Sequence, residues 1–317
     1  MTWVVTTPAA ARIPRTESRP FISLLSDWGD RDPSAAICHG VILSIAPDAL
    51  LVDITHTVDK YNIRHGALML WCALPFLPIG AHVAVVDPGV GTARRPIAIE
   101  TARGDYLVGP DNGLLLPGAD RLGGLVRAHA IENIQYRLPV VSSTFHGRDL
   151  FAPAAAHLAL GVPLDLMGPP VDPGDLVAID WPPVIVRSDE LETTAIYVDT
   201  FGNVKLAGLT ADLLAAIEGL EHGDELEVLI SPRREKFFSM RWSGTFGGVV
   251  AGDYLLYEDS YGRLCIAQNQ GNAAATLPVS EGATVLIKRP ADYSAAPEPE
   301  EGWDVADETF DLTQATS

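Results

Sequence analysis

The chain has 317 residues, 47% of them hydrophobic, which is enough apolar material for a sizeable core in one or two domains. Its net charge of −19 argues against binding to nucleic acids or anionic membrane surfaces, because phosphate groups repel an acidic protein. The apolar runs are all shorter than the about 18 residues of a membrane-spanning helix, and residues 1–19 lack the hydrophobic segment of a signal peptide. We therefore expect a cytoplasmic protein.

The first half of the chain alternates apolar runs with helical patterns. Three apolar runs predict buried strands, at 21–25, 50–54 and 82–86. Between the first two, apolar residues at helical spacing predict a helix that begins near Pro33 and ends before Pro47. The stretch 62–77 predicts a second helix with Asn62 as its N-cap. Two more strands and a helix are expected at 97–99, 106–108 and 147–160.

This order of elements is typical of an α/β domain with a central, mostly parallel sheet covered by helices, which we place at residues 20–183. In such sheets, ligands bind beyond the carboxyl ends of the strands. Asp27, Thr55-His56 and Asp87 all follow predicted strands. The sequence therefore predicts a functional site at this edge of a catalytic N-terminal domain.

The pattern changes after two proline-rich stretches, 168–170 and 181–183, which predict a linker. Short strands separated by turn residues follow, at 194–198, 225–230, 254–257 and 284–287. They predict a smaller, mostly β C-terminal domain over residues 184–290. Residues 1–19 are expected to form a flexible tail, and residues 291–317 a disordered acidic tail.

The cysteines and histidines give no sign of a disulfide or a metal site. The cysteines are widely spaced within apolar runs, which is typical of buried free thiols in a reducing compartment: Cys38, Cys72 and Cys265. The histidines that lack metal-ligand spacing are His39, His56, His65, His82 and His157. We therefore expect no metal. The glycines form neither a Walker loop nor a dinucleotide-binding fingerprint.

Two loops carry candidate catalytic residues. In the stretch 87–95, two glycines allow a tight turn that could bring Asp87 and Arg94 together, whereas the alternative is an exposed loop with a surface ion pair. In the stretch 145–149, His146 stands at the start of a helix, where it could titrate near neutral pH. The alternative there is a helix-start histidine followed by charged residues on the solvent face.

Two further motifs each allow two interpretations. The stretch 109–113 is either a turn with a helix cap or a backbone contact with a ligand. The stretch 199–203 is either a polar turn or a carboxylate and an amide that hold a polar ligand near a domain interface.

Six motifs stand in a fixed order: SDWG at 26–29, VDITH at 52–56, VDPGVG at 86–91, GPDNGL at 109–114, FHGRD at 145–149 and FGNV at 201–204. Over about 21–288 the chain thereby resembles the S-adenosyl-L-methionine hydroxide adenosyltransferases, or adenosylmethionine hydrolases, relatives of the bacterial fluorinase and chlorinase. The resemblance implies attack of water or hydroxide on ribose C5′ of S-adenosyl-L-methionine, which yields adenosine and L-methionine. No cofactor is implied, because adenosylmethionine is itself the substrate.

The resemblance also implies roles for single residues. Asp87, Arg94 and His146 match the catalytic set of the hydroxide-using branch, whereas the fluorinase has a tyrosine in place of Asp87 and a serine in place of Gly147. The implied substrate-binding residues are Asp27 at the ribose hydroxyls, Asp199 at the methionine amine, Asn203 at adenine, Ser34 and Ser260 around methionine, and Tyr61 and Phe246 beside the nucleoside. One departure is Tyr261, which replaces a fluorinase arginine near the methionine carboxylate.

The resemblance further implies a homotrimer, with the site at the subunit interface between the first domain of one subunit and the second domain of its neighbour. Two alternative functions remain. One is a halogenase that uses chloride in place of water, and the other is a protein that binds adenosylmethionine or adenosine without turnover. The Asp87 and His146 side chains favour the hydrolase.

Overall fold

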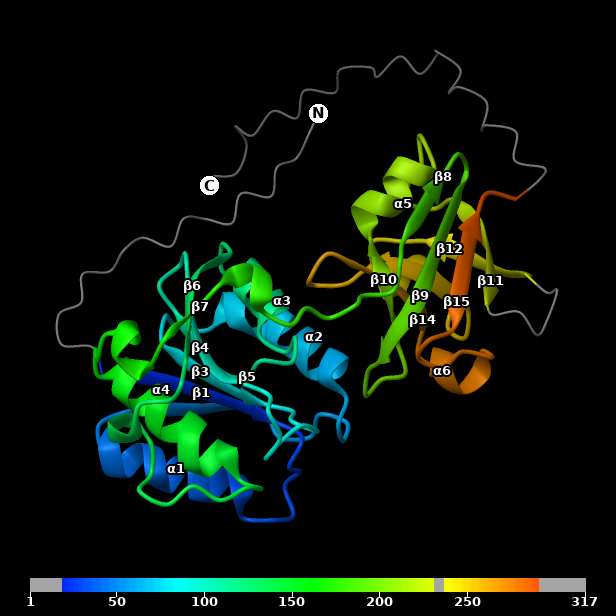
Figure 1. Ribbon diagram of the computed structural model, residues 1–317. Helices are drawn as coiled ribbons and strands as arrows, with labels where there is room; N and C mark the ends of the chain where they lie inside the picture. Colours follow the sequence, from blue (N-terminus) through cyan, green and yellow to red (C-terminus); the bar gives the residue numbers. More distant parts are fainter. Residues whose placement is uncertain (1–18, 231–236, 291–317) are drawn as a thin grey trace, which may run out of the picture. The chain divides into compact units, whose positions relative to one another are not determined.

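Residues 19–230 and 237–290 are described by a computed structural model and form two compact units, divided between Pro183 and Val184 (Figure 1). The two predicted tails, apart from Arg19, lie outside the described residues. In this part of the chain, no helix has the length and apolar character needed to cross a lipid bilayer. The predicted fold class, an α/β domain followed by a smaller β-rich domain, is confirmed.

A seven-stranded sheet forms the centre of the first unit, in the order β2-β1-β3-β5-β4-β6-β7. The strands β2, β1, β3 and β5 run parallel, as predicted, while β4, β6 and β7 extend the sheet through antiparallel pairings. The bounds are β1 (Phe21–Ser26), β2 (Leu50–Thr55), β3 (Ala81–Val85), β4 (Pro96–Thr101), β5 (Tyr106–Pro110), β6 (Leu125–Ala130) and β7 (Pro170–Val171).

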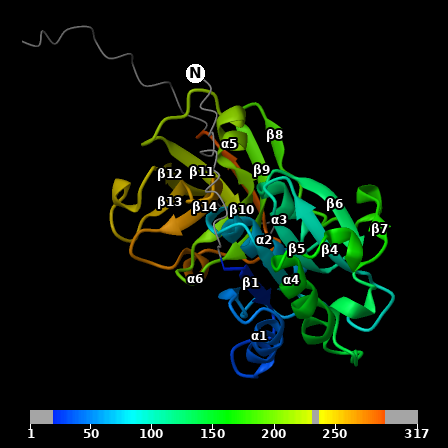
Figure 2. The same ribbon diagram turned by 90° about the vertical axis from the view of Figure 1, so that its left-hand side faces the viewer.

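Helices cover both faces of this sheet (Figures 1 and 2). The helices α1 and α4 pack together over a core that includes Ile42 and Leu158. The helices α2 and α3 pack together over a second core that includes Leu70 and Ala119. Their bounds, with those of the short helical turns, are α1 (Ser34–Ile45), α2 (Ile63–Ala73), η1 (Leu74–Phe76), α3 (Leu116–Arg121), η2 (Ile134–Tyr136), α4 (Ala152–Ala159), η4 (Leu164–Met167) and η5 (Pro173–Asp175).

The predicted helix signals act as expected. Asn62 caps α2, since its side chain accepts a hydrogen bond of 3.0 Å from the backbone N–H of His65. The first helix, α1, begins directly after Pro33 and has Ala46 as its C-cap, so Pro47 lies just beyond its end. Both helices therefore begin where the sequence predicts, and α1 also ends there, whereas α2 ends at Ala73 and the rest of the predicted helix is the 3-10 turn η1.

Two predictions in this unit are wrong in part. The strand β2 was expected to be buried, but it pairs only with β1 at the edge of the sheet, so Leu50 and Val52 are 44% and 38% exposed. The proline-rich stretch 168–170 is not a linker, because Pro170–Val171 forms β7 and pairs with β6. An edge strand accepts proline, since one side of it needs no ladder hydrogen bonds.

A buried polar chain joins three neighbouring strands of the parallel part. Ser23 Oγ lies 2.7 Å from His82 Nδ1, and His82 Nε2 lies 3.0 Å from Asp105 Oδ1. Burial would raise the pKa of Asp105, but hydrogen bonds from His82 and Arg103 lower it to about 2. All three members of the chain are at most 1% exposed. This Ser–His–Asp arrangement is therefore part of the core and has no access to a substrate.

The second unit is a closed barrel, in the order β10-β14-β13-β12-β11-β15-β9, because β10 also pairs with β9. The strand β8 pairs with the first part of β9. The four predicted strands lie within β9, β11, β13 and β15 and are confirmed. The bounds are β8 (Ile185–Arg187), β9 (Glu190–Val198), β10 (Val204–Leu209), α5 (Thr210–Ala216), β11 (Glu225–Ile230), β12 (Phe237–Trp242), η6 (Phe246–Gly248), β13 (Tyr254–Glu258), β14 (Arg263–Gln268), α6 (Ala273–Thr276) and β15 (Thr284–Lys288).

Candidate active site

The loop that follows β3 folds back on itself, so that Arg94 returns to Asp87. The backbone N–H of Val90 donates to the Asp87 carbonyl at 3.3 Å, and that of Thr92 donates to the Gly89 carbonyl at 3.1 Å. The Thr92 hydroxyl donates to the same Gly89 carbonyl at 2.7 Å. These successive turns explain how two side chains seven positions apart meet at the carboxyl end of a strand.

Gly91 brings this loop against the segment that leads to His146. Its φ of +77° lies in the left-handed region, and a Cβ atom here would overlap the carbonyl oxygen of Ser143. Glycine is the residue that meets both conditions without strain. Gly91 therefore allows the contact between the two loops, and this contact brings the segment that carries His146 to the Asp87 loop.

His146 stands at the entry to η3 (Gly147–Phe151), a single π-helical turn that leads into α4. Turns of this kind occur often at functional sites. A Cβ atom on Gly147 would lie 2.5 Å from Cζ2 of Trp28, so the Trp28 indole packs directly on the turn. The predicted helix over 147–160 is therefore present, but its first turn is wider than an α-helix.

The three predicted catalytic residues form one hydrogen-bonded cluster. Arg94 Nε donates to both carboxylate oxygens of Asp87 at 3.0 Å, and Arg94 Nη2 forms an ion pair with Asp87 Oδ2. The same Nη2 atom donates to His146 Nδ1 at 2.9 Å. The Asp87 and Arg94 side chains are only 5% and 10% exposed, so this is a buried pair and not the surface ion pair of the alternative.

The contact with Arg94 determines the tautomer of His146. A guanidinium only donates hydrogen bonds, so Nδ1 accepts and the proton of the neutral ring sits on Nε2. Burial, together with the positive charge of Arg94, holds the pKa of His146 below its ordinary value of 6.5, against the opposite effect of Asp87. At pH 7 His146 is therefore a neutral ring that offers Nε2–H as a donor.

One nitrogen of the Arg94 guanidinium makes no hydrogen bond with the described residues. Its Nη1 atom is buried and has no hydrogen-bond partner among the described residues. The Phe151 ring lies 5.2 Å from the guanidinium carbon and shields this part of the side chain. Buried donors without partners are rare in folded proteins. A ligand or water oxygen that reached this atom would supply the missing partner.

Asp149 fastens the segment that carries His146. Its carboxylate is fully buried and accepts hydrogen bonds from Arg148 Nε at 2.6 Å and from the Ser142 backbone N–H at 2.8 Å. Burial would raise the pKa of Asp149, but these hydrogen bonds lower it below its ordinary value. The alternative in which Asp149 lies on the solvent face is therefore wrong.

Asp27 and Tyr61 are brought together by a backbone contact. Asp27 follows β1 and is buried, and its Oδ2 accepts a hydrogen bond of 3.0 Å from the Tyr61 N–H. Tyr61 adopts a left-handed φ of +65°, and its ring is exposed. Non-glycine residues with this φ are uncommon and are often found at ligand sites. Ser34, the first residue of α1, is half-buried and makes no described hydrogen bond with either residue.

Asp199 and Asn203, in the second unit, form a closed polar turn after β9. Asp199 Oδ1 accepts from the backbone N–H groups of Phe201 and Asn203 at 2.9 Å. Asn203 Nδ2 donates to Asp199 Oδ2 at 2.9 Å. The predicted turn is confirmed. The carboxylate is half-buried and the amide is buried, and a ligand-binding role stays a prediction.

Phe246 and Ser260 lie elsewhere on the same barrel. The Phe246 ring is 40% exposed and lies 5.1 Å from the Tyr257 ring. Burial raises the pKa of Tyr257, and so does the charge of Asp199. Ser260 is exposed in the turn after β13, beside Tyr261, whose ring lies 5.2 Å from Lys205 Nζ.

The stretch 109–113 ends β5 and continues as a turn, and its backbone contact with a ligand stays a prediction. Asn112 Nδ2 donates to the Val86 carbonyl at 2.8 Å, directly before Asp87. Asp111 Oδ2 accepts from Arg95 Nε at 2.9 Å, at the end of the same loop. The expected helix cap is wrong, because the N-cap of α3 is Leu115, which makes no side-chain cap. The turn thus holds both ends of the 87–95 loop.

Sequence patterns alone did not single out three aromatic residues at these sites: Trp28, Phe151 and Tyr257. Phe151 lies against Arg94 and Tyr257 against Phe246, while Trp28 packs on Gly147, the residue after His146. These contacts come from tertiary packing, which no local spacing reveals. The position of Trp28 directly after Asp27, at the end of a buried strand, was the available signal.

Comparisons with known proteins find relatives of the same family for both units. The sequence pattern of the SAM hydroxide adenosyltransferase N-terminal domain matches residues 22–168, and that of the C-terminal domain matches residues 193–286. A curated (R)-S-adenosyl-L-methionine hydrolase from Salinispora tropica is 44% identical over 83% of this chain and 95% of its own length. A fluorinase from Actinopolyspora mzabensis is 28% identical over 86% of this chain and 98% of its own. The crystal structure of an uncharacterized conserved protein from Thermotoga maritima superposes with a TM-score of 0.78 at 35% identity, over 84% of this chain and 100% of that chain.

Proposed function

The chain belongs to the SAM hydroxide adenosyltransferase family, and from this premise we propose that it is an enzyme that hydrolyses S-adenosyl-L-methionine to adenosine and L-methionine. The observation that carries the mechanism is the buried cluster of Asp87, Arg94 and His146, with Arg94 Nη1 left without a partner among the described residues. This cluster offers a donor, Arg94 Nη1, and a carboxylate to one small polar molecule.

The molecule that fits this cluster is the attacking water. Arg94 Nη1 would donate to the water oxygen and leave its protons directed at an acceptor, while His146 accepts from Arg94 Nη2 and holds the guanidinium in place. Asp87 is the remaining acceptor, because Nδ1 of His146 already accepts from Arg94. We assign Asp87 as the base.

The reaction then needs no further catalyst. The water oxygen forms a bond to ribose C5′ while the C5′–S bond breaks, and its electron pair leaves with sulfur as a neutral thioether. As the new C–O bond forms, the water becomes a much stronger acid than a carboxylic acid, so its proton passes to Asp87. The leaving group requires no protonation, and we propose that no cofactor takes part.

The remaining site residues would hold the substrate. Asp27 is proposed to bind the ribose hydroxyls, with Tyr61 and Phe246 beside the nucleoside. Asn203 is proposed to contact adenine and Asp199 the methionine amine. The other residues proposed around methionine are Ser34 and Ser260. A site with several carboxylates suits a ligand that carries a sulfonium and an ammonium group.

The proposed assembly is a homotrimer with the site at the subunit interface. It would combine Asp87 of one chain with Asp199 of a neighbour, two residues that belong to separate units of the chain. A cytoplasmic location is proposed as well, and it is supported by the three cysteines, which are all buried free thiols.

The test is to incubate the protein with S-adenosyl-L-methionine and to follow adenosine and methionine by chromatography. Asp87→Asn and Arg94→Gln are expected to lower kcat by about 10²–10⁴-fold, the usual contribution of a positioned base. Arg187→Gln is the matched control, because it breaks an exposed ion pair with Glu192 in the second unit. Full activity in both site variants would refute the assignment of the cluster.

The same assay separates the two alternatives. Added chloride that yields chlorodeoxyadenosine in place of adenosine would establish a halogenase. Tight binding of adenosylmethionine by the folded protein, with neither product, would establish a binding protein. Each outcome contradicts the proposed hydrolysis.

A further inference from the structure

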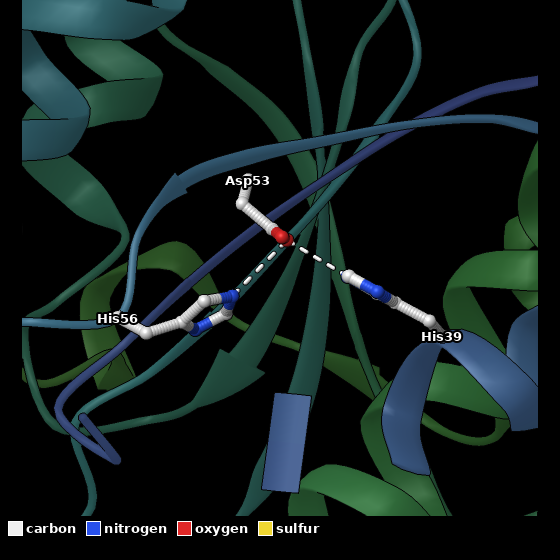
Figure 3. Close-up of side chains that lie close together, drawn as sticks. All are labelled: His39, Asp53 and His56. Atoms are coloured by element: carbon white, nitrogen blue, oxygen red, sulfur yellow. Dashed lines mark hydrogen bonds and ion pairs between the residues drawn. The ribbon is translucent and has the colours of Figure 1, made fainter. Parts of the chain in front are cut away.

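Two histidines and an aspartate converge in the first unit, apart from the Asp87 cluster (Figure 3). His39 belongs to α1, Asp53 to β2, and His56 directly follows β2. His39 Nε2 lies 2.8 Å and His56 Nε2 lies 3.0 Å from the same oxygen, Asp53 Oδ1. All three ligand-type atoms lie within 4.8 Å of one another. Three side chains from two elements therefore present three donor atoms to one small volume.

The buried histidine of this cluster, His56, has one ring nitrogen that makes no hydrogen bond with the described residues. His56 is 6% exposed, and its Nε2 atom makes no hydrogen bond with any described residue, although Asp53 Oδ1 lies only 3.0 Å away. The proximity without a hydrogen bond means that the nitrogen is not aligned with Asp53. A buried nitrogen without a partner is costly, so a ligand that engages it would be stabilising.

The other side of the His56 ring is held in place. Its Nδ1 atom lies 2.7 Å from Ser26 Oγ, and the ring stacks on Trp28 with the planes 5° apart. When Nδ1 carries the proton and donates it to Ser26, Nε2 presents a lone pair. Histidines that bind metals make such a hydrogen bond with their second nitrogen, which sets the tautomer and the ring orientation.

We propose that His39, Asp53 and His56 bind a divalent transition-metal ion, with Zn²⁺ as the best match. Two imidazole nitrogens and one carboxylate oxygen form a donor set that zinc uses in three-ligand sites, where water takes the fourth position. Asp53 is 40% exposed, which gives the ion an entry path and room for that water. Magnesium and calcium fit poorly, because they prefer oxygen ligands throughout.

A bound ion would connect three parts of the first unit. The His56 carbonyl accepts from the Gly29 N–H at 2.6 Å, and Ser26 is bonded to the His56 ring. The ion would therefore tie α1 and β2 to the segment after β1 that carries Asp27. Its role is structural, and it takes no part in the proposed reaction. The sequence-based expectation of no metal rested on local spacing, whereas these ligands meet through the packing of α1 beside β2.

The experiment uses full-length, untagged protein freed of metal with a chelator. Zn²⁺ is titrated by calorimetry and Co²⁺ by visible absorption, with one ion expected per chain and a higher Tm with Zn²⁺. His39→Gln and Asp53→Asn remove one ligand each from the more exposed side of the cluster. Each is expected to weaken Zn²⁺ binding at least about tenfold. The control is His222→Gln, an exposed histidine of the second unit, which should bind Zn²⁺ like the wild type.

The outcomes decide the proposal. Loss of the Co²⁺ absorption bands and of the zinc-induced rise in Tm in both ligand variants, but not in the control, supports the site. Circular dichroism of the metal-free variants shows that the loss does not come from unfolding. Absence of one-to-one binding by the wild type, or Zn²⁺ affinity in both ligand variants equal to that of the wild type, would mean that the cluster is a hydrogen-bonded group only and would overturn the proposal.

Discussion

Among single residues, Asp87 and Arg94 act on His146 in opposite directions. Arg94 donates to Nδ1 and lowers the pKa of the imidazole, whereas Asp87 raises it. The folded-state pKa lies below 6.5, so the unfolded chain takes up the proton first as the pH falls. The neutral ring therefore contributes its full share to the free energy of unfolding above about pH 6.5. This share declines as the pH falls from about 6.5 to the pKa of the folded state.

Neutralising each partner should therefore shift the pKa of His146 with opposite sign. Arg94→Gln should raise it, because a positive charge is removed, and Asp87→Asn should lower it further. The measurement is an NMR titration of the His146 ring proton, assigned with His146→Gln. As the pH is lowered, kcat/KM of the wild type should stay constant until the pH reaches the pKa of His146 and should fall below that pH. Shifts of equal sign in the two variants would contradict the described geometry.

Gly147 is the residue at which the space around the cluster is tightest. Gly147→Ser would push its side chain into the Trp28 ring, which is itself held between Phe145 and His56. We expect a loss of about 1–3 kcal/mol in the free energy of unfolding, as for other overpacked sites. We also expect a lower kcat, because a shift of Gly147 would displace His146, the residue directly before it.

The measurement for this substitution is thermal unfolding together with adenosine formation. Gly40→Ser is the matched control, since a Cβ atom at Gly40 of α1 meets nothing within 4 Å. An unchanged Tm and kcat in Gly147→Ser would mean that Trp28 moves aside freely, and the packing argument would then fail.

At the scale of elements, the loop between β3 and β4 positions the cluster through one close approach. Gly91→Ala would combine a left-handed φ with overlap at the Ser143 carbonyl. We expect a cost of about 1–3 kcal/mol for the strained backbone alone, and a loss of activity as Arg94 moves away from His146. Gly161→Ala is the control, because Gly161 has a φ of +90° but meets nothing within 4 Å.

Urea unfolding and kcat measured on both variants test this comparison. Both variants should be destabilised, but only Gly91→Ala should lose activity. Equal activity in the two would show that the contact between the two loops does not position the cluster.

Most helices and strands could be predicted from hydrophobic periodicity and from the proline and glycine residues that end them. The predictions that failed have physical causes. The apolar run of β2 predicted burial, yet its place at the sheet edge depends on the strand order, which no single run encodes. At the π-helical turn, Gly147 lies against Trp28, which comes from a distant strand end, and no local pattern encodes that contact. The Asp87–Arg94 pair was predictable because one short loop carries both residues. The contact of His146 with Arg94, 52 positions apart, required the fold.

At the scale of the whole molecule, the proposed site residues fall into two groups that local patterns could not connect. Six belong to the first unit and four to the barrel: Asp27, Ser34, Tyr61, Asp87, Arg94 and His146, then Asp199, Asn203, Phe246 and Ser260. The barrel residues were predicted from the family resemblance, since a polar turn such as 199–203 is common. Whether one chain supplies both groups to a site is therefore a question of assembly.

Assemblies that contain two different variants test whether one chain or two neighbouring chains supply the residues of a site. Asp87→Asn and Asp199→Asn should each be inactive alone, and Asp199→Asn keeps an oxygen that can accept from the backbone of its turn. In the proposed trimer, formed from equal amounts of the two variants, a site shared between neighbours has an intact Asp87 and an intact Asp199 in about a quarter of cases, by random pairing around a closed ring. Coexpression should therefore restore about a quarter of the wild-type kcat, with trimer size checked by light scattering. If mixed trimers form and no activity returns, each site is built within one chain and the shared-site proposal is refuted.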